Sequence, residues 1–246
     1  MLIIKPDPLV TLKNFTAARI AIGRTGASIP LKESLDFKLA HAHARDAVYS
    51  VLDIDGLSSD LKAFNLPVLH LQSNAINRQK YLKRPDYGRQ LSEDSLLLLK
   101  DCLAEADVAI IIADGLSAIA VNENAYKLLK LLIPVLTTSK LTIAPICLVE
   151  QGRVAIGDDI GNALNARFSI VLIGERPGLS AADSMGAYLT YKPQPGLTDE
   201  SRNCISNIRR QGLTHKSAAD KIFYLINESF KRKLSGVKLK DNAGFL

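Results

Sequence analysis

The run Asp107–Asp114, which reads DVAIIIAD, constrains the fold of this chain more than any other stretch. An uninterrupted apolar segment of this length is typical of a strand that is buried on both faces of a parallel sheet. Two further strand-like runs, Ile143–Val149 and Phe168–Ile173, follow it, and each is preceded by enough residues for a helix. This alternation predicts an α/β domain with a doubly wound, mainly parallel sheet.

Helical patterns occupy the stretches between and around these runs. Apolar residues recur at helical intervals over Ser92–Glu105, Ser117–Leu132, Asp158–Asn165 and Thr214–Lys233. The first residue of the first, second and fourth of these stretches is a hydroxyl residue, as expected of an N-cap. Pro134 is expected to end or kink the second helix, because proline lacks the backbone donor that a helix interior needs.

The first third of the chain shows less order. Leu31–Val51 is a helix candidate, and Pro67–Leu71 is a short strand-like run. A polar and aromatic loop at 81–89 fits either an interface or an ordinary surface loop. We therefore expect a boundary near residue 91. Residues 1–91 would form a helical and irregular region, and residues 92–246 the α/β domain.

Composition places the protein among soluble, intracellular chains. Its 246 residues can bury a sizeable core, and no apolar run approaches the length that spans a bilayer. The odd number of cysteines argues against a disulfide framework and favours a reducing cytosol. The formal charge of +6 fits a solvated basic tail better than nucleic-acid binding, because no basic stripe alternates with aromatic residues.

Three loops should meet at one edge of the predicted sheet, because parallel strands place their carboxyl ends together. They are Asp114–Ser117, Glu150–Gly157 and Gly174–Ser180. Each contains glycine, which lets the backbone approach a ligand closely. Each also carries polar side chains, namely Asp114, Ser117, Glu150, Arg153, Glu175 and Arg176. The pattern predicts a ligand crevice at this edge.

Catalytic motifs are missing from the sequence. There is no P-loop, no G-x-S-x-G elbow and no H-E-x-x-H pair, and none of the four histidines has a clear catalytic partner. We therefore expect no catalytic residue and no metal ligand in this chain. A large cofactor that performs its own chemistry would reconcile a polar crevice with the missing catalysts.

Several strings closely resemble the small (light) subunit of ethanolamine ammonia-lyase. They occur in the order of that family and cover residues 17–210: RIAIGRTGAS, LAHAHARDAV, KRPDYGRQL, IIIADGLSA, VLIGERPGLS, DSMGAYLTY and RNCISNIR. The most specific part is the stretch Val171–Arg209, in which IGERPGLS is followed by GAYLTY and RNCISNIR.

The resemblance implies an adenosylcobalamin-dependent lyase that converts ethanolamine to acetaldehyde and ammonia by a radical mechanism. It implies a Rossmann-like, cobalamin-binding small subunit that is inactive alone. A large subunit with a TIM barrel would hold the ethanolamine, and the cobalamin would lie between the two subunits. The region 1–91 would then contact the large subunit, and neither nucleic acid nor a membrane would be a partner.

Three cobalamin-binding positions carry over by the resemblance. Val154 lies in QGRVAIGDD and would form a wall against the corrin or its nucleotide tail. Glu175 lies in IGERPG and would accept a hydrogen bond from an amide or hydroxyl. Cys204 lies in RNCISN and would pack closely against the cofactor. The GAYLTY segment between the last two is expected to serve as scaffolding only.

Two alternatives stay open at this point. One is a stand-alone corrinoid- or nucleotide-binding α/β module without catalysis, which would bind its ligand without a large partner. The other is a basic nucleic-acid-binding protein, whose binding would weaken steeply with salt. The cysteine count favours a cytoplasmic location, and the resemblance adds one possibility to it. It implies encapsulation in a bacterial microcompartment for some members of the family.

Overall fold

A six-stranded sheet forms the centre of the protein in a computed structural model that describes residues 7–16, 18–100, 102 and 105–241. The strands follow one another across the sheet in the order β1-β3-β2-β4-β5-β6. Their bounds are β1 Val68–Gln72, β2 Val108–Ala113, β3 Ile146–Glu150, β4 Phe168–Gly174, β5 Met185–Tyr191 and β6 Arg202–Ile208.

The sheet is mixed. The strands β1, β3, β2 and β4 run parallel, whereas β5 lies antiparallel to β4, and β6 lies antiparallel to β5. The link between β4 and β5 spans residues 175–184 and is shorter than the crossover that parallel pairing requires. The predicted α/β class and the three predicted strands are confirmed. The sheet is mixed, with β1, β3, β2 and β4 parallel, and its doubly wound character stays a prediction.

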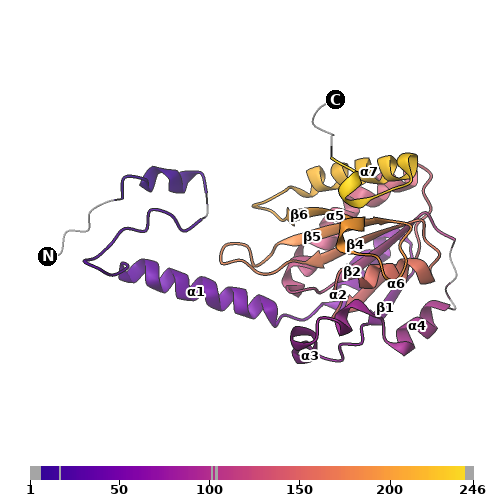
Figure 1. The fold of residues 1–246 in the computed structure, drawn as a ribbon, viewed down its shortest axis with the longest axis horizontal. Coiled ribbons are helices and arrows are strands. Elements are labelled where there is room, and N and C mark those ends of the chain that lie inside the picture. Colours follow the sequence, from indigo (N-terminus) through magenta and orange to yellow (C-terminus); the bar gives the residue numbers. More distant parts are fainter. Residues whose placement is uncertain (1–6, 17, 101, 103–104, 242–246) are drawn as a thin grey trace.

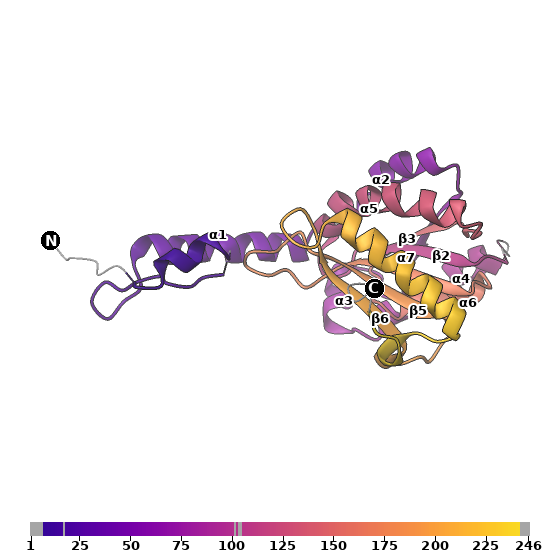
Figure 2. The ribbon, with the colours of Figure 1, turned by 90° about the horizontal axis from the view of Figure 1, so that it is seen from above.

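Strand residues alternate between two apolar clusters, one on each face of the sheet. On one face, Ile110 and Ile112 of β2 pack with α2 (Ile54–Leu61), α5 (Ala118–Thr138) and α7 (His215–Arg232). On the other face, Ala109 and Ile111 pack with α4 (Glu93–Lys100) and α6 (Ile156–Ala163). Figure 2 shows α5 and α7 side by side over the sheet.

Short 3-10 helices complete the description. They are η1 Val10–Asn14, η2 Lys62–Phe64, η3 Tyr87–Arg89, η4 Asp199–Ser201 and η5 Gly236–Lys238. The helix α3 (Arg78–Lys83) lies between β1 and η3. Within the described residues, no helix combines the length and the apolar character that crossing a bilayer would need.

The helix α5 corrects the expectation that Pro134 would end it. The helix continues through Pro134 to Thr138. Ile133 and Leu136, on either side of the proline, are both buried in the apolar cluster. Burial of these side chains offsets the cost of a proline in a helix interior, which is about 3 kcal/mol for the lost backbone hydrogen bond and the clash of the ring together.

A long arm precedes the α/β body. The helix α1 (Leu31–Val48) and the described residues before it, 7–16 and 18–30, extend away from the sheet (Figure 1). The predicted helix in this region is confirmed, but Ala47 is its only buried residue. The edge strand β1 also lies before residue 91 and pairs with β3. The division of the chain near residue 91 stays a prediction.

Candidate functional site

The three loops that follow β2, β3 and β4 meet at one edge of the sheet, as their sequences predicted. The Asp114 carboxylate, after β2, accepts hydrogen bonds from the backbone amides of Gln151 and Gly152, after β3, at 2.9 and 3.0 Å. The Leu116 amide donates to the carbonyl of Gly174, at the end of β4, at 2.9 Å. Backbone and side-chain bonds thus join the loops into one surface.

Two glycines allow this close approach. Gly115 has a positive φ of 58°, and a Cβ atom there would lie 2.2 Å from the Gly174 carbonyl oxygen. A Cβ on Gly174 would lie 2.0 Å from the Ser117 carbonyl oxygen. Both obstacles are backbone atoms, so neither position admits a side chain without a shift of the loops. The hydroxyl of Ser117 donates to the Ala182 carbonyl at 2.7 Å. Ser117 occupies the N-cap position of α5, as predicted, but its hydroxyl makes no capping hydrogen bond to the helix.

Arg78 ties this edge to the end of α1. Its guanidinium donates to the carbonyls of Val48 at 2.5 Å and Gly115 at 2.8 Å, and lies 3.7 Å from the Asp114 carboxylate. Burial nevertheless raises the pKa of Asp114 to about 6, because desolvation outweighs the backbone amides and the Arg78 charge that favour the carboxylate.

Tyr81 of α3 is buried beneath two guanidinium groups. The Arg78 and Arg153 guanidinium carbons lie 4.6 and 4.3 Å from the centre of its ring. Its hydroxyl donates to the Gly152 carbonyl at 3.3 Å. Burial raises the pKa of Tyr81 to about 12, so the ring stays a neutral phenol that both arginines can stack upon. The loop at 81–89 therefore supports the sheet edge through Tyr81.

Two adjoining cavities open at this edge. The first has a volume of about 450 Å³, and the second a volume of about 380 Å³. Arg153, Val154 and Tyr188 line both cavities, so the two lie on either side of these side chains, and we refer to them together as the trough. Tyr81, Leu116, Glu175 and Arg176 are among the other residues that line the first, and Arg89, Thr198 and Asp199 among those that line the second.

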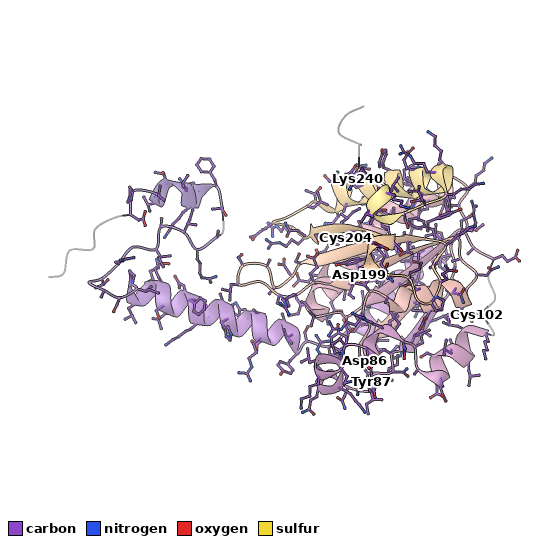
Figure 3. The ribbon with its side chains drawn as sticks, viewed as in Figure 1. Asp86, Tyr87, Cys102, Asp199, Cys204 and Lys240 are labelled. Carbon is purple, nitrogen blue, oxygen red and sulfur yellow. The ribbon has the colours of Figure 1, made fainter. Side chains whose placement is uncertain are left out.

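The structure places the three positions suggested by the resemblance around Tyr188. Val154 lines both cavities with it, and Glu175 lines the first. Cys204 stands directly opposite Tyr188 in the β5–β6 register, and its side chain is exposed. Figure 3 shows Cys204 and Asp199 on the β6 side of the molecule, and Asp86 and Tyr87 below it, near α3. Cys204 does not line either cavity but lies beside the trough, one strand away from Tyr188.

Glu175 is held by the strands that follow it. Its Oε2 accepts hydrogen bonds from the Ser184 hydroxyl at 2.6 Å and from the Asn207 amide at 3.2 Å. Its backbone amide donates to the Ser184 carbonyl at 3.0 Å. Within the described part of the chain, these bonds use one carboxylate oxygen only. The side chain is thus fixed in position at the rim of the first cavity.

Tyr188 is the functional candidate that the sequence analysis missed. It belongs to the GAYLTY segment, which was expected to be scaffolding, and β5 does pair with both of its neighbours. Burial raises the pKa of the Tyr188 hydroxyl, with smaller contributions from Cys204 and then Glu175. Alternation was the available signal, since Met185, Ala187 and Leu189 point into one apolar cluster and place Tyr188 on the opposite face.

Proteins of one known family have sequences similar to this chain. Residues 6–240 match the ethanolamine ammonia-lyase light chain family. The ethanolamine ammonia-lyase small subunit of Pseudomonas putida strain GB-1 is 49% identical over 243 residues, which are 97% of this chain and 89% of that protein. The small subunit of P. putida strain KT2440 is 50% identical over 244 residues, with the same coverage.

A relative from another genus agrees with these two. The ethanolamine ammonia-lyase small subunit of Azotobacter vinelandii is 49% identical over 241 residues, which are 96% of this chain and 89% of that protein. The matched residues include β1 to β6, α1 and the loops that line the trough. The chain therefore belongs to the ethanolamine ammonia-lyase light chain family and is a subunit of a lyase.

Proposed function

We propose that this chain is the small subunit of an adenosylcobalamin-dependent ethanolamine ammonia-lyase, which converts ethanolamine to acetaldehyde and ammonia. In this proposal, a Rossmann-like domain forms one wall of the cobalamin site, at the interface with the large subunit. The observation that carries it is the arrangement around Tyr188. Val154, Glu175 and Cys204 come from three separate segments, and each lies beside this one side chain.

The residues present suit one wall of a cobalamin site. A corrinoid offers a broad apolar ring edged by amide groups, and such a ligand needs apolar contact with a few well-placed polar groups. Val154 and the Tyr188 ring supply apolar surface, and Glu175 supplies an acceptor for an amide. Arg153 adds a guanidinium whose Nε is buried without a hydrogen-bond partner. That atom has no exposed surface, so a ligand would meet the guanidinium through its Nη groups.

The chain's own contribution would be binding and orientation. Adenosylcobalamin, when bound, supplies the radical chemistry of the reaction. Glu175 would orient the cofactor through an amide hydrogen bond, because Ser184 and Asn207 already fix its carboxylate. Val154 and Tyr188 would exclude water from the covered side. Ethanolamine would bind to the large subunit, and no residue of this chain would act on it.

The arm supports the proposed contact with the large subunit. Leu31, Leu35 and Leu39 recur every fourth residue along α1, and each is more than half exposed. They form an apolar stripe, and an exposed stripe of this kind is typical of a protein interface. We refer to these three residues as the α1 stripe.

The proposed location is the bacterial cytoplasm. All three cysteines, Cys102, Cys147 and Cys204, are free thiols, which fits a reducing compartment.

Glu175→Ala tests the proposed site. The variant and the wild type are each assembled with an ethanolamine ammonia-lyase large subunit, and cobalamin retention is measured by absorbance after equilibrium dialysis. We expect cofactor affinity to fall by about tenfold, the effect of losing one hydrogen bond to a charged group. The free energy of unfolding of the chain should change by less than the free energy of cofactor binding.

Glu150→Ala is the matched control. Glu150 is the last residue of β3 at this edge, where it pairs with His70 at 2.8 Å, but it lines neither cavity. It should leave cofactor affinity unchanged. An unchanged affinity in Glu175→Ala would remove Glu175 from the site.

A further inference from the structure

Arg153 is held in one place by the loop around η3 and by α3. Its backbone amide donates to the Gly88 carbonyl at 2.7 Å, and its Nη2 donates to the Tyr81 carbonyl at 3.2 Å. A Cβ on Gly88 would lie 2.7 Å from the Cγ of Arg153, so the stem of the arginine fills the space that this glycine leaves. Stacking on Tyr81 then fixes the plane of the guanidinium.

Arg153 differs from the other partly or fully buried arginines of this region in having no counter-ion. Arg78 lies 3.7 Å from the Asp114 carboxylate, and Arg202 forms a buried ion pair with Asp158 and a second pair with Asp199 at 2.9 Å. Among the described residues, no carboxylate lies within ion-pair distance of Arg153. A half-buried, permanently charged group without a partner is costly, and a bound anion would offset that cost.

The position of Arg153 favours an anionic ligand in the trough. It lines both cavities, with the cationic Arg176 beside the first and the cationic Arg89 beside the second. The two carboxylates of the trough already have partners. Glu175 accepts hydrogen bonds from Ser184 and Asn207, and Asp199 pairs with Arg202. Three arginines and two carboxylates line the trough, so its net charge is positive even though Glu175, among the described residues, keeps one oxygen as a free acceptor.

We propose that Arg153 binds a phosphate diester of the ligand, which in cobalamin is the phosphate of the nucleotide loop. This inference rests on the proposed function. The amide side chains of the corrin are uncharged, so the phosphate is the one anionic group that cobalamin offers to an unpaired guanidinium. The fork of N–H donors in arginine matches phosphate oxygens, and a pre-oriented guanidinium loses little freedom on binding.

The test compares ligands that differ in the phosphate. The chain is assembled with a large subunit, and dissociation constants are measured for cyanocobalamin, cobinamide phosphate and dicyanocobinamide, the last of which lacks both nucleotide and phosphate. Arg153→Gln should weaken the binding of the first two by about 10- to 100-fold and leave that of dicyanocobinamide within about twofold. Arg84→Gln removes the same charge from an exposed site that lines neither cavity and should change none of the three.

A second measurement needs no variant. Salt should weaken the binding of the two phosphate-containing ligands to the wild-type complex more than that of dicyanocobinamide. Three results would overturn the role of Arg153 and leave the cobalamin site in place. The first is an equal loss of affinity for all three ligands in Arg153→Gln, and the second is no loss of affinity for any of them. The third is the same salt dependence of binding for all three ligands. A wild-type complex that binds no corrinoid would overturn the proposed function, and this inference with it.

Discussion

The single residue Asp114 joins the loops after β2 and β3, and its burial makes the stability of the protein depend on pH. Its carboxylate accepts two backbone hydrogen bonds that join the loops after β2 and β3. Burial raises its pKa to about 6, well above the value of about 3.9 in an unfolded chain. Between these two pH values the folded state keeps a proton that the unfolded state has released. The contribution of Asp114 to stability therefore decreases as pH rises from about 4 to about 6.

Asp114→Asn should remove this pH dependence. We expect the free energy of unfolding of the wild type, relative to the variant, to fall by about 2 to 3 kcal/mol between pH 4 and pH 7. The side-chain NH₂ group of the asparagine would also face one of the two backbone N–H donors. This lowers the free energy of unfolding of the variant by an amount that does not vary with pH. Urea unfolding at several pH values measures both effects. Asp60→Asn, at an exposed aspartate, serves as the control, and parallel pH profiles for wild type and Asp114→Asn would contradict the account.

Tyr188, and the stacking of Arg153 on Tyr81, are the parts of the site that the sequence could not predict. The loops that contain Val154 and Glu175 follow strands with unmistakable apolar runs, so their shared edge could be predicted. Tyr188 comes from a strand whose alternation is subtle. Arg153 becomes informative only beside Tyr81, which lies more than 70 residues earlier, and no local pattern links the two.

The strands also differ in how well the sequence predicts them. The alternation from β2 to β4 could be predicted because each strand is buried on both faces and is separated from the next by an apolar-faced helix. The strands β5 and β6 could not, because β6 is exposed at Cys204, Ser206 and Asn207 and its sequence mixes polar with apolar residues. Their antiparallel direction depends on the short turn after β4, and it turns a parallel sheet into a mixed one.

The contact between the ends of β2 and β4 yields a prediction at the element scale. Gly174→Ala should destabilise the protein by about 3 kcal/mol, because the added methyl would meet the Ser117 and Asp114 carbonyl oxygens at 2.0 and 2.6 Å. Gly178→Ala lies in the same loop, where the nearest atom would be 3.7 Å away, and should be almost neutral. Urea denaturation of both variants makes the comparison. Equal free energies of unfolding in the two variants would contradict this prediction and show that the loops after β2 and β4 can move apart at little cost.

At the scale of the whole molecule, the arm carries apolar side chains that no other described part of this chain covers. The helix α1 projects from the α/β body (Figure 1), and the α1 stripe faces solvent. Under the proposed function, the large subunit would occupy this surface. The same assembly would close the trough at the sheet edge from its open side.

Leu35→Asp combined with Leu39→Asp should weaken assembly with the large subunit by at least about tenfold, because both apolar contacts would be replaced by buried charges. The melting temperature of the chain alone should hardly change, since both residues are exposed in it. Val237→Asp, at an exposed apolar residue of η5, is the control. Sedimentation velocity over a titration gives the affinity, and assembly as tight as that of the wild type would exclude the α1 stripe from the interface.

Reconstitution tests the central claim most directly. This chain is mixed with an ethanolamine ammonia-lyase large subunit, adenosylcobalamin and ethanolamine, and acetaldehyde is measured over time. Omission of each component in turn provides the controls, and cobalamin binding by this chain alone would favour the stand-alone module instead. We predict acetaldehyde only when both subunits and the cofactor are present. If the complete mixture forms no more acetaldehyde than the large subunit alone, and no complex forms, the account is contradicted.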